Sequence, residues 1–342
     1  MRALLAGFLA LIVSLPAAAQ SPPLTRVRFS LDWAFQGSAA PWLLAEQRGF
    51  FREEGIELAL TSANGSSELF QRLATGTAEI GTADLAGMIM FNARNPQAAL
   101  QAVMIAHNRS TVAIMATASS GIRQPADLRG KTVAGPESDA GRLLWPAFAR
   151  AVGLPVDAIT FTATTAALRE PMLVRGQAQA MSGLTTSGVL NLVGLGVPRD
   201  QIVIFRYADY GVPLYGHSLM TRPGWAEQNP RLVTGIIRAM ARGLRAAHQD
   251  PDAAIAALRA REPLVEPMIE KARMQLTYEE AYFTPDVLAN GIGRADPARI
   301  AAMTRAVAEA FGIANPPAPE TLYTDRYLPP AADLVARGPG GS

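Results

Sequence analysis

Histidines and carboxylates are the residues here that could bind a metal ion or transfer protons. The chain has three histidines, His107, His217 and His248, and no two of them have the spacing of ligands to one metal ion. It has no cysteine, which excludes a thiolate metal site and a disulfide. We therefore expect neither a metal ion nor a cofactor.

Motifs of nucleophilic and nucleotide chemistry are also missing. The sequence contains no Gly-x-Ser-x-Gly elbow and no phosphate-binding Walker loop. Residues 135–139 precede a predicted helix but lack the second and third glycines of a dinucleotide fingerprint. Asp32 and Asp84 could form an acid pair, although helix capping and hinge hydrogen bonds are the simpler account of both. We predict a binding protein, not an enzyme.

The elements that must position these residues alternate between strands and helices. Residues 25–31 alternate polar and apolar side chains, which is typical of a half-buried strand. A helix near Ser38 with Pro41 in its first turn is predicted to end at Gly49, and one from Ser66 or Ser67 to end at Gly76. Further strands are predicted at 56–60, 78–81, 131–134 and 160–162, and long helices follow residue 229. This order predicts α/β units with largely parallel sheets.

Two stretches a hundred residues apart have the same pattern. Residues 73–81 and 173–181 both run from a helix end through a glycine and an alanine into a buried strand. The chain is therefore predicted to build two similar α/β units, with a cleft between them. A chance similarity of two such units is the alternative.

The first residues have the pattern of an export signal. Arg2 is followed by an apolar run over 3–15, and Ala17–Ala19 provide small residues for cleavage. We predict a signal peptide at 1–19, removed on export to the periplasm. The net charge is +2, with basic residues scattered singly, so no nucleic-acid partner is expected.

Several motifs, in this order, resemble a known family. They are Asp32-Trp33, the segments 49–58 (GFFREEGIEL) and 65–67 (GSS), the series Gly76, Gly81 and Asp84, and the segments 127–133 (DLRGKTV) and 209–216 (DYGVPLYG). Over about 26–327 the chain is similar to the periplasmic binding proteins for nitrate, sulfonates, taurine and thiamine-pyrimidine precursors.

The resemblance implies an α/β, two-lobed type II periplasmic binding protein fold with a ligand cleft between the lobes and extra C-terminal helices. Lobe one would comprise 25–117 and 212–328, lobe two 118–211 with hinge crossovers near Ala118 and Tyr207, and 329–342 a flexible tail. The protein would be a monomer that binds a small molecule and delivers it to an ABC permease in the inner membrane. A ligand sensor or an enzyme on the same fold is the alternative.

Two departures from the family restrict the function. Precursor synthases of the family use a cysteine-rich motif, which this chain lacks. Precursor-binding members carry aromatic residues and a glutamate where this chain has the small, hydroxylic segment 183–187. The ligand is therefore left open among sulfonates, aromatic compounds and pyrimidine-like compounds.

Ligands of such sheets lie beyond the carboxyl ends of the strands, where helix N-termini offer free N–H groups. The exposed face of Trp33 could stack on a planar ligand, while Trp42 and Trp145 are expected in the core. Asp139 would repel an anionic ligand unless Arg142 compensates, which argues against a simple anion such as nitrate. The full set of predicted ligand-binding residues is Asp32, Trp33, Ser38, Gly65, Ser66, Asp84, His107, Ser138, Asp139, Thr185, Tyr210 and Tyr215.

Overall fold

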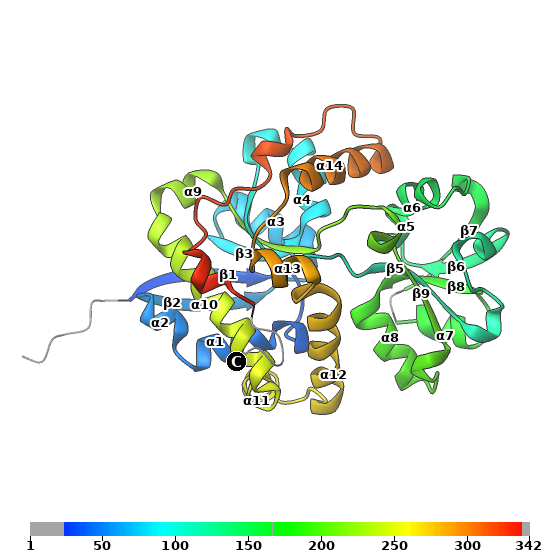
Figure 1. The fold of residues 1–342 in the computed structure, drawn as a ribbon, viewed down its shortest axis with the longest axis horizontal. Helices are drawn as coiled ribbons and strands as arrows, with labels where there is room; N and C mark the ends of the chain where they lie inside the picture. The colour runs from blue at the N-terminus through cyan, green and yellow to red at the C-terminus, as the bar shows by residue number, and fades with distance from the viewer. Residues whose placement is uncertain (1–23, 138, 166, 337–342) are drawn as a thin grey trace, which may run out of the picture.

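The computed structural model of the chain describes residues 24–336, except 138 and 166. Two α/β lobes, each built on its own five-stranded sheet, lie side by side (Figure 1). This confirms the predicted two-lobed α/β class. The predicted signal peptide at 1–19 and the predicted site residue Ser138 lie outside the described residues.

The first sheet has the strand order β2-β1-β3-β10-β4. β1 runs parallel to β2 and β3, while β10 is antiparallel to β3 and β4. β10 therefore begins at the edge of the sheet where β1 and β3 end. The bounds are β1 (Thr25–Leu31), β2 (Ile56–Ser62), β3 (Ile80–Asp84), β4 (Gln101–Ile105) and β10 (His217–Thr221).

The second sheet repeats this arrangement with the order β7-β6-β8-β5-β9. β6 is parallel to β7 and β8, and β5 is antiparallel to β8, as β10 is to β3 in the first sheet. The repeat predicted from 73–81 and 173–181 thus corresponds to the same helix–glycine–strand unit in each lobe. The bounds are β5 (Val112–Thr117), β6 (Lys131–Gly135), β7 (Ile159–Ala163), β8 (Ala180–Leu184) and β9 (Ile202–Arg206).

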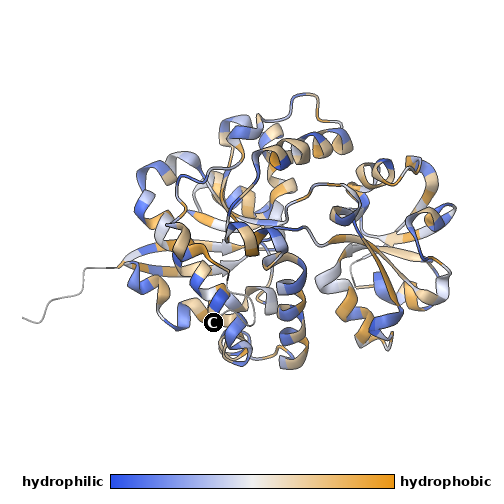
Figure 2. Ribbon diagram, viewed as in Figure 1, coloured by the Kyte–Doolittle hydropathy of each residue, from blue (hydrophilic) through white to orange (hydrophobic). Residues whose placement is uncertain are grey.

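Helices cover the faces of both sheets, with apolar strands inside and polar helix faces outside (Figure 2). The α-helices of the first lobe are α1 (Ala40–Gln47), α2 (Phe50–Glu53), α3 (Ser66–Thr75), α4 (Leu85–Arg94), α9 (Pro223–Gln228), α10 (Pro230–Gln249), α11 (Pro251–Arg261), α12 (Pro267–Thr277), α13 (Pro285–Asn290), α14 (Pro297–Phe311) and α15 (Ala331–Leu334). Those of the second lobe are α5 (Ala140–Leu143), α6 (Trp145–Ala151), α7 (Arg169–Val174) and α8 (Thr185–Gly194).

Tighter and wider turns join these elements. A π-helical turn, η8 (Tyr278–Tyr282), links α12 to the segment before α13. The 3₁₀ turns are η1 (Gly37–Ala39), η2 (Pro96–Ala98), η3 (Ala118–Ser120), η4 (Pro125–Leu128), η5 (Val156–Ala158), η6 (Arg199–Gln201), η7 (Tyr207–Tyr210) and η9 (Pro319–Thr321). Ser38 lies within η1 and is not the N-cap of α1, which is Ala39.

The structure differs from the predicted domain boundaries in two places, at β5 and in the C-terminal tail. β5 belongs to the second sheet, so the chain crosses between the sheets after Ile105 and before Val112, earlier than the predicted 118. The predicted flexible tail from 329 includes α15, whose Leu334 is fully buried and accepts a backbone hydrogen bond from Ile292. Short apolar elements such as α15 are held by tertiary packing, which composition alone does not reveal.

Within 24–336, no helix is long and apolar enough to cross a membrane.

Candidate functional site in the first lobe

A hydrogen-bonded Asp32–His217 pair lies at the carboxyl edge of the first sheet. Asp32 directly follows β1, and His217 begins the antiparallel β10, so topology brings the two together from 185 positions apart in sequence. The His217 Nε2 atom lies 3.0 Å from Oδ2 of Asp32. The same oxygen accepts a hydrogen bond of 2.5 Å from the Ser66 hydroxyl at the start of α3.

Asp84 completes the acidic side of this cluster. It ends β3 directly opposite His217 in the antiparallel ladder, and its Oδ1 accepts from the backbone of Gly87, which caps α4. Asp32 and Asp84, the acid pair suggested by the sequence, therefore flank the same imidazole. Asp84 caps a helix, as the simpler account of the two predicted, whereas Asp32 binds a histidine of its own sheet, which that account did not predict.

The protonation of the cluster follows from burial and charge. Burial opposes the cationic form of His217, but the Asp32 carboxylate, its hydrogen bond and Asp84 outweigh it and raise the pKa of His217 to about 9. Burial also opposes ionisation of Asp32, yet His217 and the hydrogen bonds lower the pKa of Asp32 below its usual value. Burial dominates at Asp84 and raises its pKa. Near neutral pH the pair is an imidazolium and a carboxylate.

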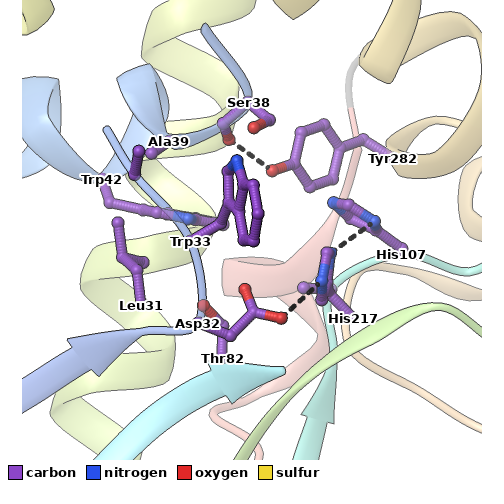
Figure 3. Close-up of a pocket in the computed structure, with 12 residues that line it drawn as sticks. Leu31, Asp32, Trp33, Ser38, Ala39, Trp42, Thr82, His107, His217 and Tyr282 are labelled. Atoms are coloured by element: carbon purple, nitrogen blue, oxygen red, sulfur yellow. Dashed lines mark hydrogen bonds and ion pairs between the residues drawn. The ribbon is translucent and has the colours of Figure 1, made fainter. Parts of the chain in front are cut away.

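His107 stands next to this pair as a neutral ring. Burial, and then the charge of His217, lower the pKa of His107 well below the usual value. Its Nδ1 lies 3.3 Å from Nδ1 of His217. Because the cationic His217 has an N–H at both nitrogens, His107 accepts through Nδ1 and carries its own proton on Nε2. Figure 3 shows this second nitrogen turned toward Trp33.

Aromatic side chains frame the space above the pair. Trp33 is 55% exposed, whereas Trp42 is buried beneath it, as expected of a core residue. Tyr282 packs edge-on against His107, with ring centroids 4.8 Å apart, and donates a 2.8 Å hydrogen bond to the Ser38 carbonyl. The small cavity, about 50 Å³, is lined by Leu31, Asp32, Trp33, Ala34, Ser38, Ala39, Trp42, Thr82, Ala106, His107, His217 and Tyr282 (Figure 3).

Three groups at this cavity are free to contact a ligand, from Asp32, His107 and Trp33. One carboxylate oxygen of Asp32 is occupied by His217 and Ser66, and the other points toward the Trp33 ring (Figure 3). The pocket therefore offers an acceptor at Asp32, a donor at His107 and an exposed aromatic face at Trp33. Of the described residues that line it, none is lysine or arginine.

Some of the predicted site residues lie at this cavity, and others lie elsewhere in the structure. Asp32, Trp33, Ser38 and His107 line it, while Ser66 and Asp84 support it from behind. Gly65 contributes only its backbone N–H, which donates to the Asp32 carbonyl at 2.6 Å.

The predicted tyrosines lie in apolar packing instead. Tyr215 is 1% exposed, and its hydroxyl accepts from the Asp296 backbone. Tyr210 packs edge-on against Phe148 and Phe205 in the second lobe. Both lie in the second crossover, between β9 and β10, but their rings turn into the core because each finds an aromatic or backbone partner there.

In the second lobe, the predicted residues are engaged by protein groups. Asp139 caps α5 by accepting from the backbone of Gly141 and Arg142, and the guanidinium 3.5 Å from it is that of Arg169, not Arg142 as predicted. Thr185 is fully buried, and its hydroxyl donates to Glu280. Arg169 was not predicted because it is distant in sequence and becomes a neighbour only through folding.

Among the lining residues outside the predicted set, His217 and Tyr282 contribute most to the hydrogen bonding and aromatic packing of the pocket. His217 follows a glycine at the start of β10, and its pairing with Asp32 depends on the antiparallel insertion of that strand. Tyr282 comes from a π-helical turn 250 residues after Asp32, and no local pattern indicates it. Within the described chain, no group of three or more His, Cys, Asp or Glu side chains is arranged to hold a metal ion.

Comparisons with known proteins assign the family. The model of the family described as "NMT1/THI5 like" matches residues 36–254. The chain belongs to this family. The riboflavin-binding protein RibY of Chloroflexus aurantiacus is 27% identical over 258 residues, covering 70% of this chain and 67% of that protein. The 4-amino-5-hydroxymethyl-2-methylpyrimidine phosphate synthase of Aspergillus parasiticus is 22% identical over 273 residues, covering 77% and 78% of the two chains.

The fold comparison agrees with the resemblance seen in the sequence. The periplasmic aliphatic sulphonate-binding protein SsuA of Escherichia coli superposes with a TM-score of 0.67 at 15% identity, covering 93% of this chain and 96% of the other. At this identity the likeness establishes the fold alone. The predicted type II periplasmic binding protein fold is thus confirmed, including its C-terminal helices.

Proposed function

We propose that this protein captures a small planar nitrogen heterocycle between its two lobes and delivers it to an ABC permease in the inner membrane. The proposal includes export to the periplasm, action as a monomer and hinge bending at the two crossovers. Its support is family membership, the fold, and a relative named as a riboflavin-binding protein. The observation that carries the ligand class is the set of groups facing the first-lobe cavity.

An aromatic ligand fits these groups better than a sulfonate does. The exposed face of Trp33 offers stacking area, which aliphatic sulfonates cannot use fully. The free oxygen of Asp32 accepts an N–H from the ligand, and Nε2–H of His107 donates to a ring nitrogen or carbonyl. A ligand with an adjacent donor and acceptor on one edge, as in aminopyrimidines and flavins, satisfies both.

Electrostatics disfavours an anionic ligand at this position. The Asp32 carboxylate repels a sulfonate, and the positive charge of His217 is already paired with it. No lysine or arginine lies among the described lining residues to compensate. A desolvated anion without a partner would lose several kcal/mol relative to water, roughly the cost of an unpaired buried charge.

A thermal-shift and calorimetric screen tests this assignment. Riboflavin, 4-amino-5-hydroxymethyl-2-methylpyrimidine and ethanesulfonate would be titrated into the purified mature chain. A true ligand at 100 times its Kd stabilises the native state by about 2.7 kcal/mol, a clear rise in Tm. We expect stabilisation by one of the heterocycles. Tighter binding of ethanesulfonate than of either heterocycle would overturn the assignment.

Recovery of the bound compound tests carriage against catalysis. Because one relative is a synthase, the ligand should be extracted after long incubation and its mass measured by mass spectrometry. Carriage requires an unchanged mass. The lack of cysteine supports carriage, because the family resemblance associates the synthases with a cysteine-rich motif.

A further inference from the structure

The π-helical turn η8 lies where the two lobes meet and turns one side chain toward each. Tyr282 lines the first-lobe cavity, while Glu280, two residues earlier, points toward the second lobe. Figure 1 shows α12, which leads into this turn, facing α8 across the gap between the lobes. The π-helix is rare and occurs mostly as single turns, frequently at functional sites.

Glu280 is a buried carboxylate held by donors of the opposite lobe. It is 4% exposed, and it accepts from the Thr185 hydroxyl at the start of α8 and from the Arg206 guanidinium at the end of β9. Thr185 and Arg206 both belong to the second sheet and its helices, whereas Glu280 belongs to the C-terminal helices of the first lobe.

A second polar contact crosses between the lobes from α12, the helix that leads into η8. Arg273 of α12 donates to the Thr186 carbonyl at 2.8 Å. Its Nε lies 3.1 Å from Glu270, which accepts from the Gly37 backbone at 2.5 Å. Gly37 directly precedes Ser38, a residue of the cavity. Both bridges therefore connect the cavity wall of the first lobe to α8 of the second.

The neighbouring charges reinforce the Glu280 bridge. Arg206 lies 3.5 Å from Asp209, and Arg109 lies 3.4 Å from the same carboxylate. Arg109 also donates to the Glu280 carbonyl at 2.8 Å, which ties the first crossover to η8. Charge-assisted hydrogen bonds of this kind are stronger than neutral ones, and separating the lobes would break those made to the side chain of Glu280.

We propose that η8 is a latch, in which Glu280 crosses to the second lobe and holds the two lobes closed while Tyr282 contacts the bound ligand. The inference rests on the proposed function, because a latch matters only if binding closes the lobes. A ligand that fixes Tyr282 also fixes the backbone that carries Glu280, so occupancy of the cavity and closure favour each other.

A distance measurement between the lobes tests the latch without any ligand. Because the chain has no cysteine, Met268→Cys on α12 and Leu195→Cys after α8 give a unique pair of spin-label sites, both exposed. Glu280→Gln keeps the side-chain size and removes its charge. We expect the ratio of short to long distances to fall about tenfold, as the loss of a charged hydrogen bond predicts. The adjacent, exposed Glu279→Gln is the matched control and should leave the ratio unchanged.

A second variant keeps the test decisive if Glu280→Gln folds poorly. Thr185→Val preserves the shape of the side chain and removes only the hydroxyl that donates to Glu280, and it should shift the ratio in the same direction by a smaller factor. An unchanged ratio in a folded Glu280→Gln protein, or equal shifts in Glu279→Gln, would overturn the latch. The same spin-label distances also test closure itself. If riboflavin or the pyrimidine binds by calorimetry but leaves these distances unchanged in the protein without further substitutions, closure on binding is overturned.

Discussion

The two lobes have the same strand order but divide the chemistry unequally. In the first lobe, Asp32 directly follows β1 and Asp84 ends β3, and both carboxylates lie beside His217. At the equivalent positions of the second lobe, Pro136 follows β6 and Leu184 ends β8. The same strand order therefore places two carboxylates at these positions in one lobe and none in the other.

Small residues at the second-lobe edge explain its different role. A side chain at Gly135 would collide with the Ser182 hydroxyl, and one at Gly141 would press on Asp139 and Ser182. These glycines let β6, β8 and the start of α5 pack closely, with Asp139 used as a cap. Repeated topology fixes where a site can form, while the residues at the strand ends decide what chemistry each copy can support.

The largest expected difference between the lobes is in their aspartates. Asp32→Ala removes the partner of a cationic, largely buried His217 and should lower the free energy of unfolding by about 2 kcal/mol at pH 7. Asp139→Ala removes a helix cap and a 3.5 Å contact with Arg169, but Arg169 keeps its 2.6 Å ion pair with Glu170, so the change should cost about 1 kcal/mol. Urea denaturation measures the loss of unfolding free energy in each variant. An equal loss, or a larger loss in Asp139→Ala, would show that the two aspartates do not differ in this way.

Ligand affinity should depend strongly on the exposed aromatic ring of the first lobe. Trp33→Ala should weaken binding of the heterocycle identified in the screen by about tenfold, the loss expected for one stacking face. Stability should change little, since the ring is 55% exposed. Calorimetric titration measures affinity, and Trp225→Ala, which does not line the cavity, is the control. Unchanged affinity in Trp33→Ala would show that the ligand does not bind in this pocket.

The Asp32–His217 pair should give the first lobe a distinct pH dependence. Because the pKa of His217 is raised from 6.5 to about 9 in the folded protein, its stabilising effect is complete below pH 6.5 and is lost as pH rises toward 9. The difference in unfolding free energy between the unaltered protein and His217→Gln should therefore decrease over that window. For His248→Gln the difference should stay flat above pH 7, because burial lowers the pKa of His248.

The smallest effect concerns the glycine that ends the same helix in each lobe. Gly76 and Gly176 adopt left-handed conformations with φ of 78° and 70°. Alanine at either position should cost about 1 kcal/mol, and the two costs should agree because neither added side chain meets a close neighbour. Gly224→Ala, in α9 with a negative φ and open space, should instead be neutral or slightly stabilising. Thermal unfolding compares the three, and unequal costs at 76 and 176 would show that the repeat is only topological.

Local pattern was sufficient to predict much of the architecture. Alternation over 25–31 predicted β1 with its bounds, and Gly76 and Gly176 marked equivalent helix ends because only glycine adopts their backbone conformation readily. Asp32 and Trp33 could be named as site residues because they follow a recognisable strand at the edge where ligands bind. These features depend on neighbours in sequence.

The pairing of distant side chains was decided only by the tertiary structure. His217 reaches Asp32 because β10 returns antiparallel into the first sheet, and Tyr282 reaches the cavity from a π-helical turn near the end of the chain. The same folding turned Thr185 toward Glu280 and buried Tyr215 against Asp296. Sequence determined the elements and the edge at which they could act, since both follow from local sterics and periodicity. The protonation states and the contact between lobes follow from burial and proximity, which exist only once the chain has folded.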